Sequence, residues 1–148
     1  MAEFQIDPRL VADSAPLAAL KLCQARLFGD ARWPWVVLIP RKPGAHEIEH
    51  LAAADRVQLM EEIVAAGSAV RAMGASLGRP VEKLNVGSLG NIVAQLHVHV
   101  IGRRADDPAW PGPAWGVAGK VAYDAAALMV AQTAALPAFE GVKRKAGG

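Results

Sequence analysis

Hydrophobic residues along this chain follow two periods, which separate its predicted helices from its predicted strands. Between about residues 55 and 77 they recur at steps of three and four, and this spacing predicts one long helix. Asp55 and Gln58 resemble a capping pair at its start, while Gly74 and Gly78 mark its far end.

Runs of β-forming residues predict four strands, at 20–28, 35–39, 83–86 and about 93–101. The second of these is β-branched and apolar throughout, so we expect both of its faces to be covered. A C-terminal helix is predicted over about 121–136, where Pro137 stops it. Adjacent strands joined by short turns indicate an antiparallel sheet, and the helices would cover its apolar face. The order of elements therefore predicts an α+β domain of two layers.

The chain has 148 residues, a length typical of one domain. We therefore expect a single domain over 1–148, with a core motif region at about 20–116 and a basic, solvated tail at 143–148. A formal net charge of +2 is too small to predict a nucleic-acid surface, and a single cysteine, Cys23, excludes an internal disulfide. No apolar run approaches the ~20 residues of a membrane span, and the start lacks the order of a signal peptide. These features predict a cytoplasmic protein with no nucleic-acid or membrane partner.

Two histidines stand one residue apart in the run Gln95-Leu96-His97-Val98-His99. On a strand, Gln95, His97 and His99 would share one face, with roughly 7 Å between successive side chains. A neutral imidazole held at one ring nitrogen can attack phosphorus with the other, which splits a hard displacement into two easier steps. Gln95, His99, Asn85 on the neighbouring strand and the turn at 87–91 would supply donors for the phosphate.

Two other interpretations of these histidines remain open. They occupy the outward polar positions of a half-buried strand, or they share a zinc ion with His46 or His50. The run from His46 to His50 matches the H-E-x-x-H pattern of zinc peptidases. Because Pro43 and Gly44 come just before it, a helix there would only be starting, and a solvated loop or the start of a helix is the favoured interpretation.

Two tryptophans, Trp110 and Trp115, lie on a proline-rich loop at about 106–116. Their rings would either pack on the domain or across a dimer interface, or stack on a base or close a pocket. Packing is the favoured interpretation.

The segment 83–103 carries Asn85, Gly87 and Ser88, followed by the run Gln95 to Ile101. It resembles the signature of the histidine triad (HIT) family, His-φ-His-φ-His-φ-φ, in which φ is apolar. The similarity covers about 20–115 and is strongest toward the bacterial branch often labelled diadenosine-tetraphosphate-hydrolase-like. This resemblance implies a HIT-like fold with an antiparallel sheet of about five strands, one long helix and a C-terminal helix. It also implies a homodimer that needs no metal or other cofactor.

The resemblance further implies roles for individual residues. The family's middle histidine, the nucleophile, falls on His97, and the last histidine, which contacts the phosphate and leaving group, falls on His99. The family's phosphate-contacting amide falls on Asn85, and a ribose-contacting polar residue falls on Asp30. The expected substrate-binding set is completed by Gly87, Ser88, Asn91 and Gln95.

Two positions depart from the family pattern. Gln95 replaces the first triad histidine, and Trp35 stands where many members have a fourth histidine beside the triad. Glutamine cannot titrate and indole offers one donor, so both changes concern turnover more than binding. We predict a nucleotide phosphohydrolase or nucleotidyl transferase that forms a nucleotidyl-histidine intermediate. Its substrate would be an adenine nucleotide derivative, a dinucleoside polyphosphate or a phosphoramidate. The alternatives are a nucleotide-binding module with weak or no turnover and a metal-dependent hydrolase.

Overall fold

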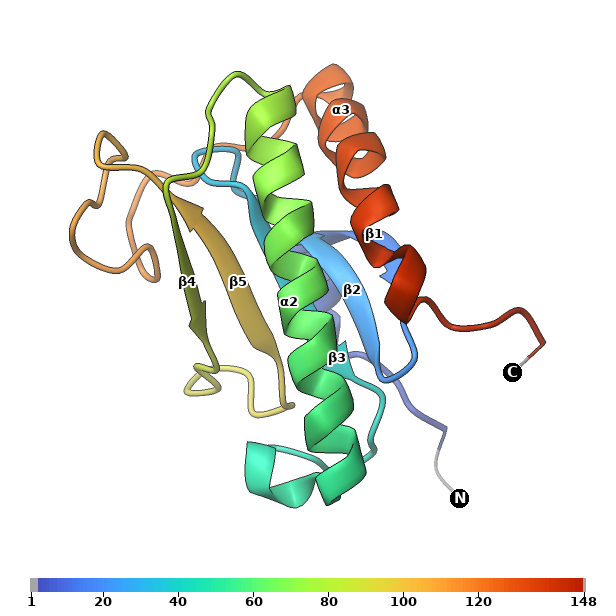
Figure 1. Cartoon of the computed structure of the whole chain (residues 1–148). Helices are drawn as coiled ribbons and strands as arrows, with labels where there is room; N and C mark the ends of the chain where they lie inside the picture. Colours follow the sequence, from blue (N-terminus) through green and yellow to red (C-terminus); the bar gives the residue numbers. More distant parts are fainter. Residues whose placement is uncertain (1–2, 148) are drawn as a thin grey trace.

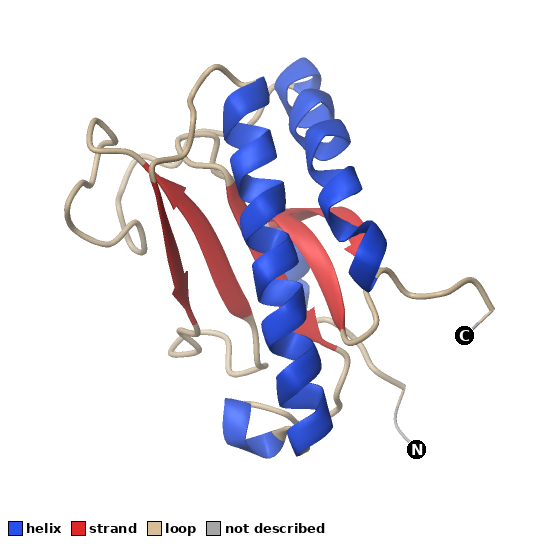
Figure 2. Ribbon diagram, viewed as in Figure 1, coloured by secondary structure: helices blue, strands red, loops and turns tan. Residues whose placement is uncertain are grey.

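The structure, a computed structural model, describes residues 3–147 and is built on a five-stranded antiparallel sheet in the order β1-β2-β3-β5-β4. The strands are β1 (Ser14–Ala19), β2 (Cys23–Phe28), β3 (Trp35–Pro40), β4 (Lys83–Gly87) and β5 (Val98–Arg103). Two helices, α2 (Ala53–Ser76) and α3 (Ala125–Ala135), lie side by side over one face of the sheet (Figure 1, Figure 2). This arrangement confirms the predicted α+β fold.

The N-terminal part of the sheet differs from the prediction. The segment 20–28 is not one strand, because the chain turns after Leu20 and β2 begins only at Cys23. The sequence does not predict β1, since Ser-Ala-Pro-Leu-Ala-Ala has no β-branched residue and contains a proline. As an edge strand with an irregular register between Pro16 and Ala18, β1 tolerates the missing N–H of that proline.

Strand β3 lies at the centre of the sheet and is buried at every position. Val36 and Leu38 belong to the main core, which α2 covers, whereas Trp35, Val37 and Ile39 belong to a second apolar cluster on the opposite face. The expectation that both faces of this strand are covered is therefore confirmed.

Helix α2 begins without the predicted cap. Its N-cap is Ala52, which has no side-chain capping bond. Asp55 instead pairs with Lys42 at 3.0 Å, and Gln58 donates a 2.9 Å hydrogen bond to Glu62 one turn later. The predicted capping pair is wrong, because both side chains have partners elsewhere.

The far end of α2 agrees with the sequence. Gly78 follows the C-cap Leu77 with φ of 74°, a left-handed conformation that glycine adopts without a Cβ penalty. Gly74 lies inside the helix rather than at its end, and it is buried there.

Helix α3 ends at Ala135, within one residue of its predicted end before Pro137, but the chain does not leave the helical path there. The 3-10 helix η2 (Leu136–Val142) continues it, and Pro137 stands in the first turn, where its missing N–H costs nothing. By length and composition, the stretch Ala125–Val142 is long and apolar enough to cross a membrane, with a mean hydropathy of 1.3. At 18 residues, this run approaches the ~20 residues of a membrane span, so the expectation that no apolar run does so is wrong. In the fold the stretch packs on α2 and places three side chains in the core, those of Ala131, Ala135 and Phe139.

The basic tail is held more firmly than a solvated terminus. Lys143 forms an isolated β-bridge with Leu20, and the N–H of Arg144 donates to the carbonyl of Ala19 at 2.9 Å. The chain is therefore fixed to the β1–β2 connection as far as Arg144.

The two faces of the sheet are covered by different kinds of structure. Helices α2 and α3 cover one face. The other face is covered by the N-terminal segment, which contains the short helix α1 (Pro8–Ala12), and by the loop at 104–119. In Figure 1 the N-terminal segment passes behind the sheet, on the side away from α2. This second face carries His99 beside Trp35.

Candidate active site

The two histidines of the His-x-His run lie at the start of β5, not in its middle. The last pair of the β3–β5 ladder joins Leu38 to Val98, so His97 directly precedes the strand and His99 lies within it. The N–H of Leu96 instead donates to the carbonyl of Ala45 in the loop after β3, at 2.9 Å. The predicted strand over 93–101 is thus too long at its beginning. Gln95, His97 and His99 do not alternate along one regular strand.

His97 is held by the main chain of Gln95. Its Nδ1 lies 2.6 Å from the carbonyl oxygen of Gln95, and a carbonyl only accepts, so Nδ1 carries the proton. In the neutral ring this leaves the lone pair on Nε2. The hydroxyl of Ser88 donates to the carbonyl of His97 at 3.0 Å and ties the turn after β4 to this segment. Residue 97 is therefore oriented by its neighbours on both sides.

His99 is held by Trp35, and its Nδ1 accepts a hydrogen bond where the Nδ1 of His97 donates one. The indole Nε1–H of Trp35 donates to Nδ1 of His99 at 2.9 Å, so Nδ1 is the acceptor and Nε2 carries the proton. Burial lowers the pKa of His99 to about 4, and the nearby charge of His97 acts in the same direction. Near neutral pH His99 is therefore uncharged and presents an N–H at Nε2.

Aromatic rings surround this pair of histidines. The rings of His97 and His99 lie 4.9 Å apart at 75°, and Trp115 lies edge-on to His99 at 5.6 Å. A Cβ on Gly87 would meet the Trp115 ring at 3.0 Å, so glycine at this position lets the indole lie against β4. Trp115 packs on the domain as predicted, but it does so directly against the histidine pair. The exposed fractions of His97 and His99 are 4% and 7%.

Asn85 lies on β4 and is oriented by Arg103. The guanidinium donates to Oδ1 of Asn85 at 2.8 Å, which turns the amide NH₂ the other way, and among residues 3–147 nothing hydrogen-bonds that NH₂ group. Arg103 is itself buried and forms a two-bond ion pair with Asp107. Burial would raise the pKa of Asp107, but the bonds from Arg103 and from main-chain N–H groups hold it well below its ordinary value.

Other predicted site residues have partners of their own. Asp30 is buried, pairs with Arg32 at 2.9 Å and accepts from the N–H of Val121, so its carboxylate fixes the chain near 117–121. Asn91 is exposed on the turn after β4. The structure thus brings together His97, His99, Gln95 and Ser88, orients Asn85, and gives Asp30 an ion-pair role.

The side chain of Gln95 reaches a segment that the sequence analysis does not consider. Its Oε1 accepts from the N–H of Asp7 at 2.8 Å, and its Nε2 donates to the carbonyl of Gln5 at 2.8 Å. The hydrogen bonds from Arg9 lower the pKa of the Asp7 carboxyl, and the charge of His97 adds to this effect. No local pattern in the sequence indicates that Asp7 lies near His97, because 90 positions separate the two.

The H-E-x-x-H run does not form a zinc-peptidase helix. Only Ile48–His50 is helical, as the short 3-10 helix η1, and Nδ1 of His50 accepts from the N–H groups of His46 and Glu47. Among residues 3–147, no group of three His, Cys, Asp or Glu side chains is placed to hold a metal ion. A site joining His97 and His99 to His46 or His50 is therefore not formed in this fold.

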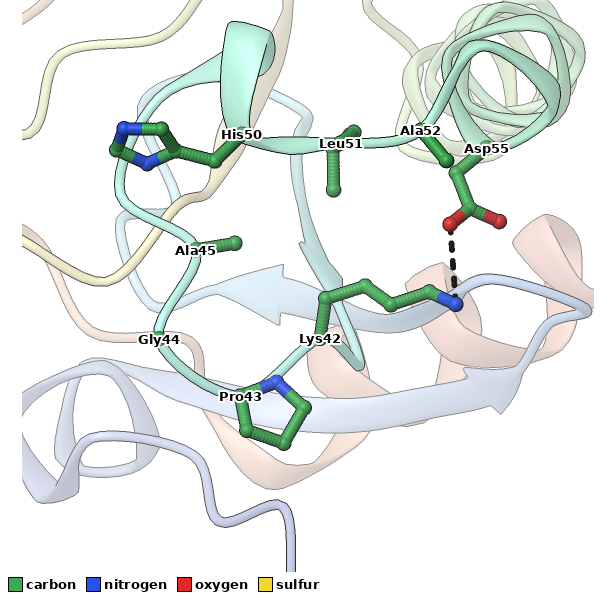
Figure 3. A pocket seen from close by; sticks show the side chains of 8 residues that line it. All are labelled: Lys42, Pro43, Gly44, Ala45, His50, Leu51, Ala52 and Asp55. Atoms are coloured by element: carbon green, nitrogen blue, oxygen red, sulfur yellow. Dashed lines mark ion pairs between the residues drawn. The ribbon is translucent and has the colours of Figure 1, made fainter.

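The loop after β3 encloses a separate cavity of about 330 Å³ (Figure 3). The Lys42–Asp55 ion pair closes one side of it, and of the residues considered above for a site only His50, a candidate zinc ligand, lines it. It is lined by Lys42, Pro43, Gly44, Ala45, His50, Leu51, Ala52 and Asp55. Through the carbonyl of Ala45, this loop supports the segment that leads to His97.

Solved structures of histidine triad proteins share the fold of this chain, among them the following three. A histidine triad protein from Sinorhizobium meliloti 1021 is 38% identical, with a TM-score of 0.81, and the match covers 90% of this chain and 96% of that one. One from Bradyrhizobium japonicum is 37% identical, with a TM-score of 0.84 and coverage of 93% and 99%. One from Marinobacter aquaeolei VT8 is 36% identical, with a TM-score of 0.83 and coverage of 95% and 99%. No curated protein matches the chain.

A family model supports the same assignment from the sequence. The model described as "HIT domain" matches residues 9–106, which is more than half of the chain and includes both histidines of the pair. The chain therefore belongs to the HIT domain family.

Proposed function

We propose that this chain is a nucleotide phosphohydrolase or nucleotidyl transferase that acts at the α-phosphate of an adenine nucleotide derivative, with His97 as nucleophile. Membership of the HIT family suggests a nucleotide-binding hydrolase or transferase. The observation that carries the finer proposal is the opposite orientation of the two rings. The Gln95 carbonyl leaves the lone pair of His97 on Nε2, and Trp35 leaves a proton on Nε2 of His99.

The proposed reaction has two displacements. Nε2 of His97 forms a bond to the α-phosphorus while the bond to the bridging oxygen or nitrogen breaks, and the leaving group takes that electron pair. The ring then carries a positive charge, which the Nδ1–H bond to the Gln95 carbonyl stabilises. Water attacks the phosphorus next and releases a proton to solvent, and the N–P bond breaks with its electron pair returning to Nε2 of His97, which leaves the ring neutral. The nucleoside monophosphate leaves with the water oxygen, and another acceptor in place of water gives transfer.

The phosphate needs donors that carry no negative charge. The Nε2–H of His99 and the free NH₂ of Asn85 are two such donors, and the turn from Gly87 to Asn91 offers further main-chain N–H groups. Ser88 and Gln95 would act by holding His97, since their side chains already have main-chain partners. For Asp30 we retain the ribose contact as a proposal, in which a ribose hydroxyl shares the carboxylate with Arg32.

A nucleotide-binding module with weak or no turnover is the second candidate. It is favoured by the low exposure of the two rings, 4% for His97 and 7% for His99, since a nucleophile must come within bonding reach of phosphorus.

The proposal includes a homodimer and assigns Gln95 to the first position of the triad. The exposed face of α2 supports self-association, because Val57, Met60 and Val64 follow one another at helical spacing with exposed fractions of 57–68%. The molar mass in solution tests this part, and a monomer at micromolar concentration would contradict it.

The test of function compares the wild type with His97→Ala and with His46→Ala, a matched control at an exposed histidine outside the site. Each protein is incubated in chelator with diadenosine tetraphosphate or adenosine 5′-phosphoramidate, and release of nucleoside monophosphate is followed. We expect turnover by the wild type and His46→Ala and its loss, by a factor on the order of 10³ or more, in His97→Ala.

Two results would change the conclusion. Binding of both compounds without release by the wild type would favour the binding module. Equal turnover by the wild type and His97→Ala would remove His97 from the nucleophile role.

A further inference from the structure

The N-terminal segment 3–10 crosses the sheet face that carries the histidines. Phe4, Ile6 and Leu10 pack against the cluster that contains Trp35, and Asp7 lies close enough to His97 for their charges to interact. The segment therefore forms one cover of the candidate active site, and the proposed reaction does not use it.

The side chain of Gln95 holds this segment by two hydrogen bonds, one that it accepts and one that it donates. Its acceptor oxygen takes the N–H of Asp7, and its donor nitrogen takes the carbonyl of Gln5, both at 2.8 Å. A side chain must carry a donor and an acceptor at its tip to make both bonds. Glutamate cannot donate to the Gln5 carbonyl, and methionine, of similar length, makes neither bond well.

The same residue also holds the nucleophile. The carbonyl of Gln95 accepts from Nδ1 of His97 at 2.6 Å, so one residue joins the N-terminal segment to the reacting ring. A further bond runs from the guanidinium of Arg9 to the carbonyl of Ile92, in the loop before Gln95.

Little of the His97 side chain is open to solvent, so a small displacement of the segment beside it changes how much of the ring a substrate can reach. The exposed fraction of His97 is 4%, and displacement at phosphorus requires the attacking nitrogen to approach within about 3–3.5 Å of the phosphorus. Four side-chain hydrogen bonds, including that of Ser14 to the carbonyl of Leu10, and three half-buried apolar side chains hold the segment 3–10. It lies outside the sheet and therefore opens at a lower free-energy cost than a strand.

We infer that Gln95 is a positioning residue that fastens the N-terminal segment 3–10 beside His97 and thereby sets the access of substrate to its Nε2. The consequence for turnover rests on the proposed function. The control of access to His97 does not, and it is tested separately.

The test measures how fast diethyl pyrocarbonate acylates each histidine, by mass spectrometry of the full chain after digestion. Gln95→Met removes both bonds, and Gln95→Glu keeps the acceptor but loses the donor. Gln132→Met is the matched control. Gln132 lies on α3, and its amide also donates to a main-chain carbonyl, that of Pro16.

In Gln95→Met we expect His97 to be acylated about tenfold faster than in the wild type, a factor equivalent to 1.4 kcal/mol and of the size expected for losing such hydrogen bonds. Gln95→Glu should fall between the two, and Gln132→Met should match the wild type. The exposed His46 and His50 should react at one rate in all four proteins. Amide exchange at Asp7 should rise in Gln95→Met, because Gln95 is the acceptor of that N–H.

Two outcomes would overturn the inference. One is an unchanged acylation rate of His97 in Gln95→Met. The other is an equal increase at His99, which Trp35 and Trp115 cover, because that result would indicate general loosening. Nucleotide turnover is measured separately on the same proteins. If the wild type turned over neither nucleotide, the proposed function would be contradicted, while the acylation rates of His97 would still decide the role of Gln95.

Discussion

The indole N–H of Trp35 donates a 2.9 Å hydrogen bond to Nδ1 of His99, across the β3–β5 ladder. This bond occupies the lone pair that a proton would need to convert His99 into an imidazolium ion. It acts in the same direction as the burial that lowers the pKa of His99 to about 4. Trp35 thereby keeps His99 neutral, as a donor at Nε2.

Trp35→Phe should raise the pKa of His99 by about one pH unit, because the variant frees Nδ1 and one pH unit is close to the net worth of a hydrogen bond. NMR titration of the ring would measure it. Trp115→Phe is the control, since that indole also contacts His99, while within the described chain its N–H has no partner. An equal rise in both variants would mean that ring volume, rather than the hydrogen bond, sets the pKa.

A neutral His99 should favour substrates whose leaving group departs as an anion. The polyphosphate of diadenosine tetraphosphate needs no proton to leave, whereas the amine of a phosphoramidate does. We therefore expect kcat/KM at pH 7.5 to be at least about tenfold higher for diadenosine tetraphosphate than for adenosine 5′-phosphoramidate. Trp35→Phe should reduce that ratio. A wild type that prefers the phosphoramidate would contradict a purely hydrogen-bonding role of His99.

The low pKa of His99 also makes the fold sensitive to acid. The unfolded chain binds a proton near pH 6.5, whereas the folded chain binds it only near pH 4. Stability should therefore fall as the pH drops from 6.5 to 4, by up to about 3 kcal/mol from this residue. Urea unfolding of the wild type and His99→Gln at pH 7 and pH 4 would measure the difference, since the carboxylates are common to both proteins. Equal losses of free energy in the two would exclude His99 as the source.

Local sequence patterns were sufficient to predict the elements that have a hydrophobic pattern of their own. Strand β3 is a continuous apolar run and α2 carries a helical repeat, and both form where the sequence indicates. Strand β1 has no such signal and exists because it pairs with β2. The start of β5 is set by its neighbours: β3 pairs only as far as Val98, and the N–H of Leu96 goes to Ala45 instead.

The site was predictable as a set of residues but not as a set of contacts. The His-x-His run with Asn85 indicates the family, which the comparisons confirm, while the roles of the individual residues stay predictions. The bonds that fix the two rings come from Trp35, 64 positions before His99, and from a main-chain carbonyl. Gln95 has the polarity expected of a phosphate donor, but its amide bonds to the N-terminal segment. These hydrogen bonds join residues that are far apart in the sequence, and the periodicity of hydrophobic residues does not predict such contacts.

Glu62→Gln should destabilise the fold by about 1–3 kcal/mol, the range for a buried donor left without an acceptor. The carboxylate of Glu62 is fully buried on α2 and accepts from the N–H groups of Leu22 and Cys23, at 3.0 and 2.7 Å. An amide would place an NH₂ group against one of them. Chemical unfolding would measure the loss. Glu61→Gln makes the same change at the exposed neighbouring position and should stay within about 0.5 kcal/mol of the wild type.

Gly102→Ala should destabilise the protein because β5 has no room for a methyl group on its helix-facing side. A Cβ on Gly102 would lie 2.6 Å from Val81, 2.7 Å from Pro34 and 2.8 Å from Val70, all side-chain carbons. Overpacking of this kind costs about 1–3 kcal/mol. The free energy of unfolding in urea would report it. Gly141→Ala is the control, because a Cβ there meets no heavy atom within 4 Å. A Gly102→Ala protein as stable as Gly141→Ala would show that α2 moves away from the sheet at little cost.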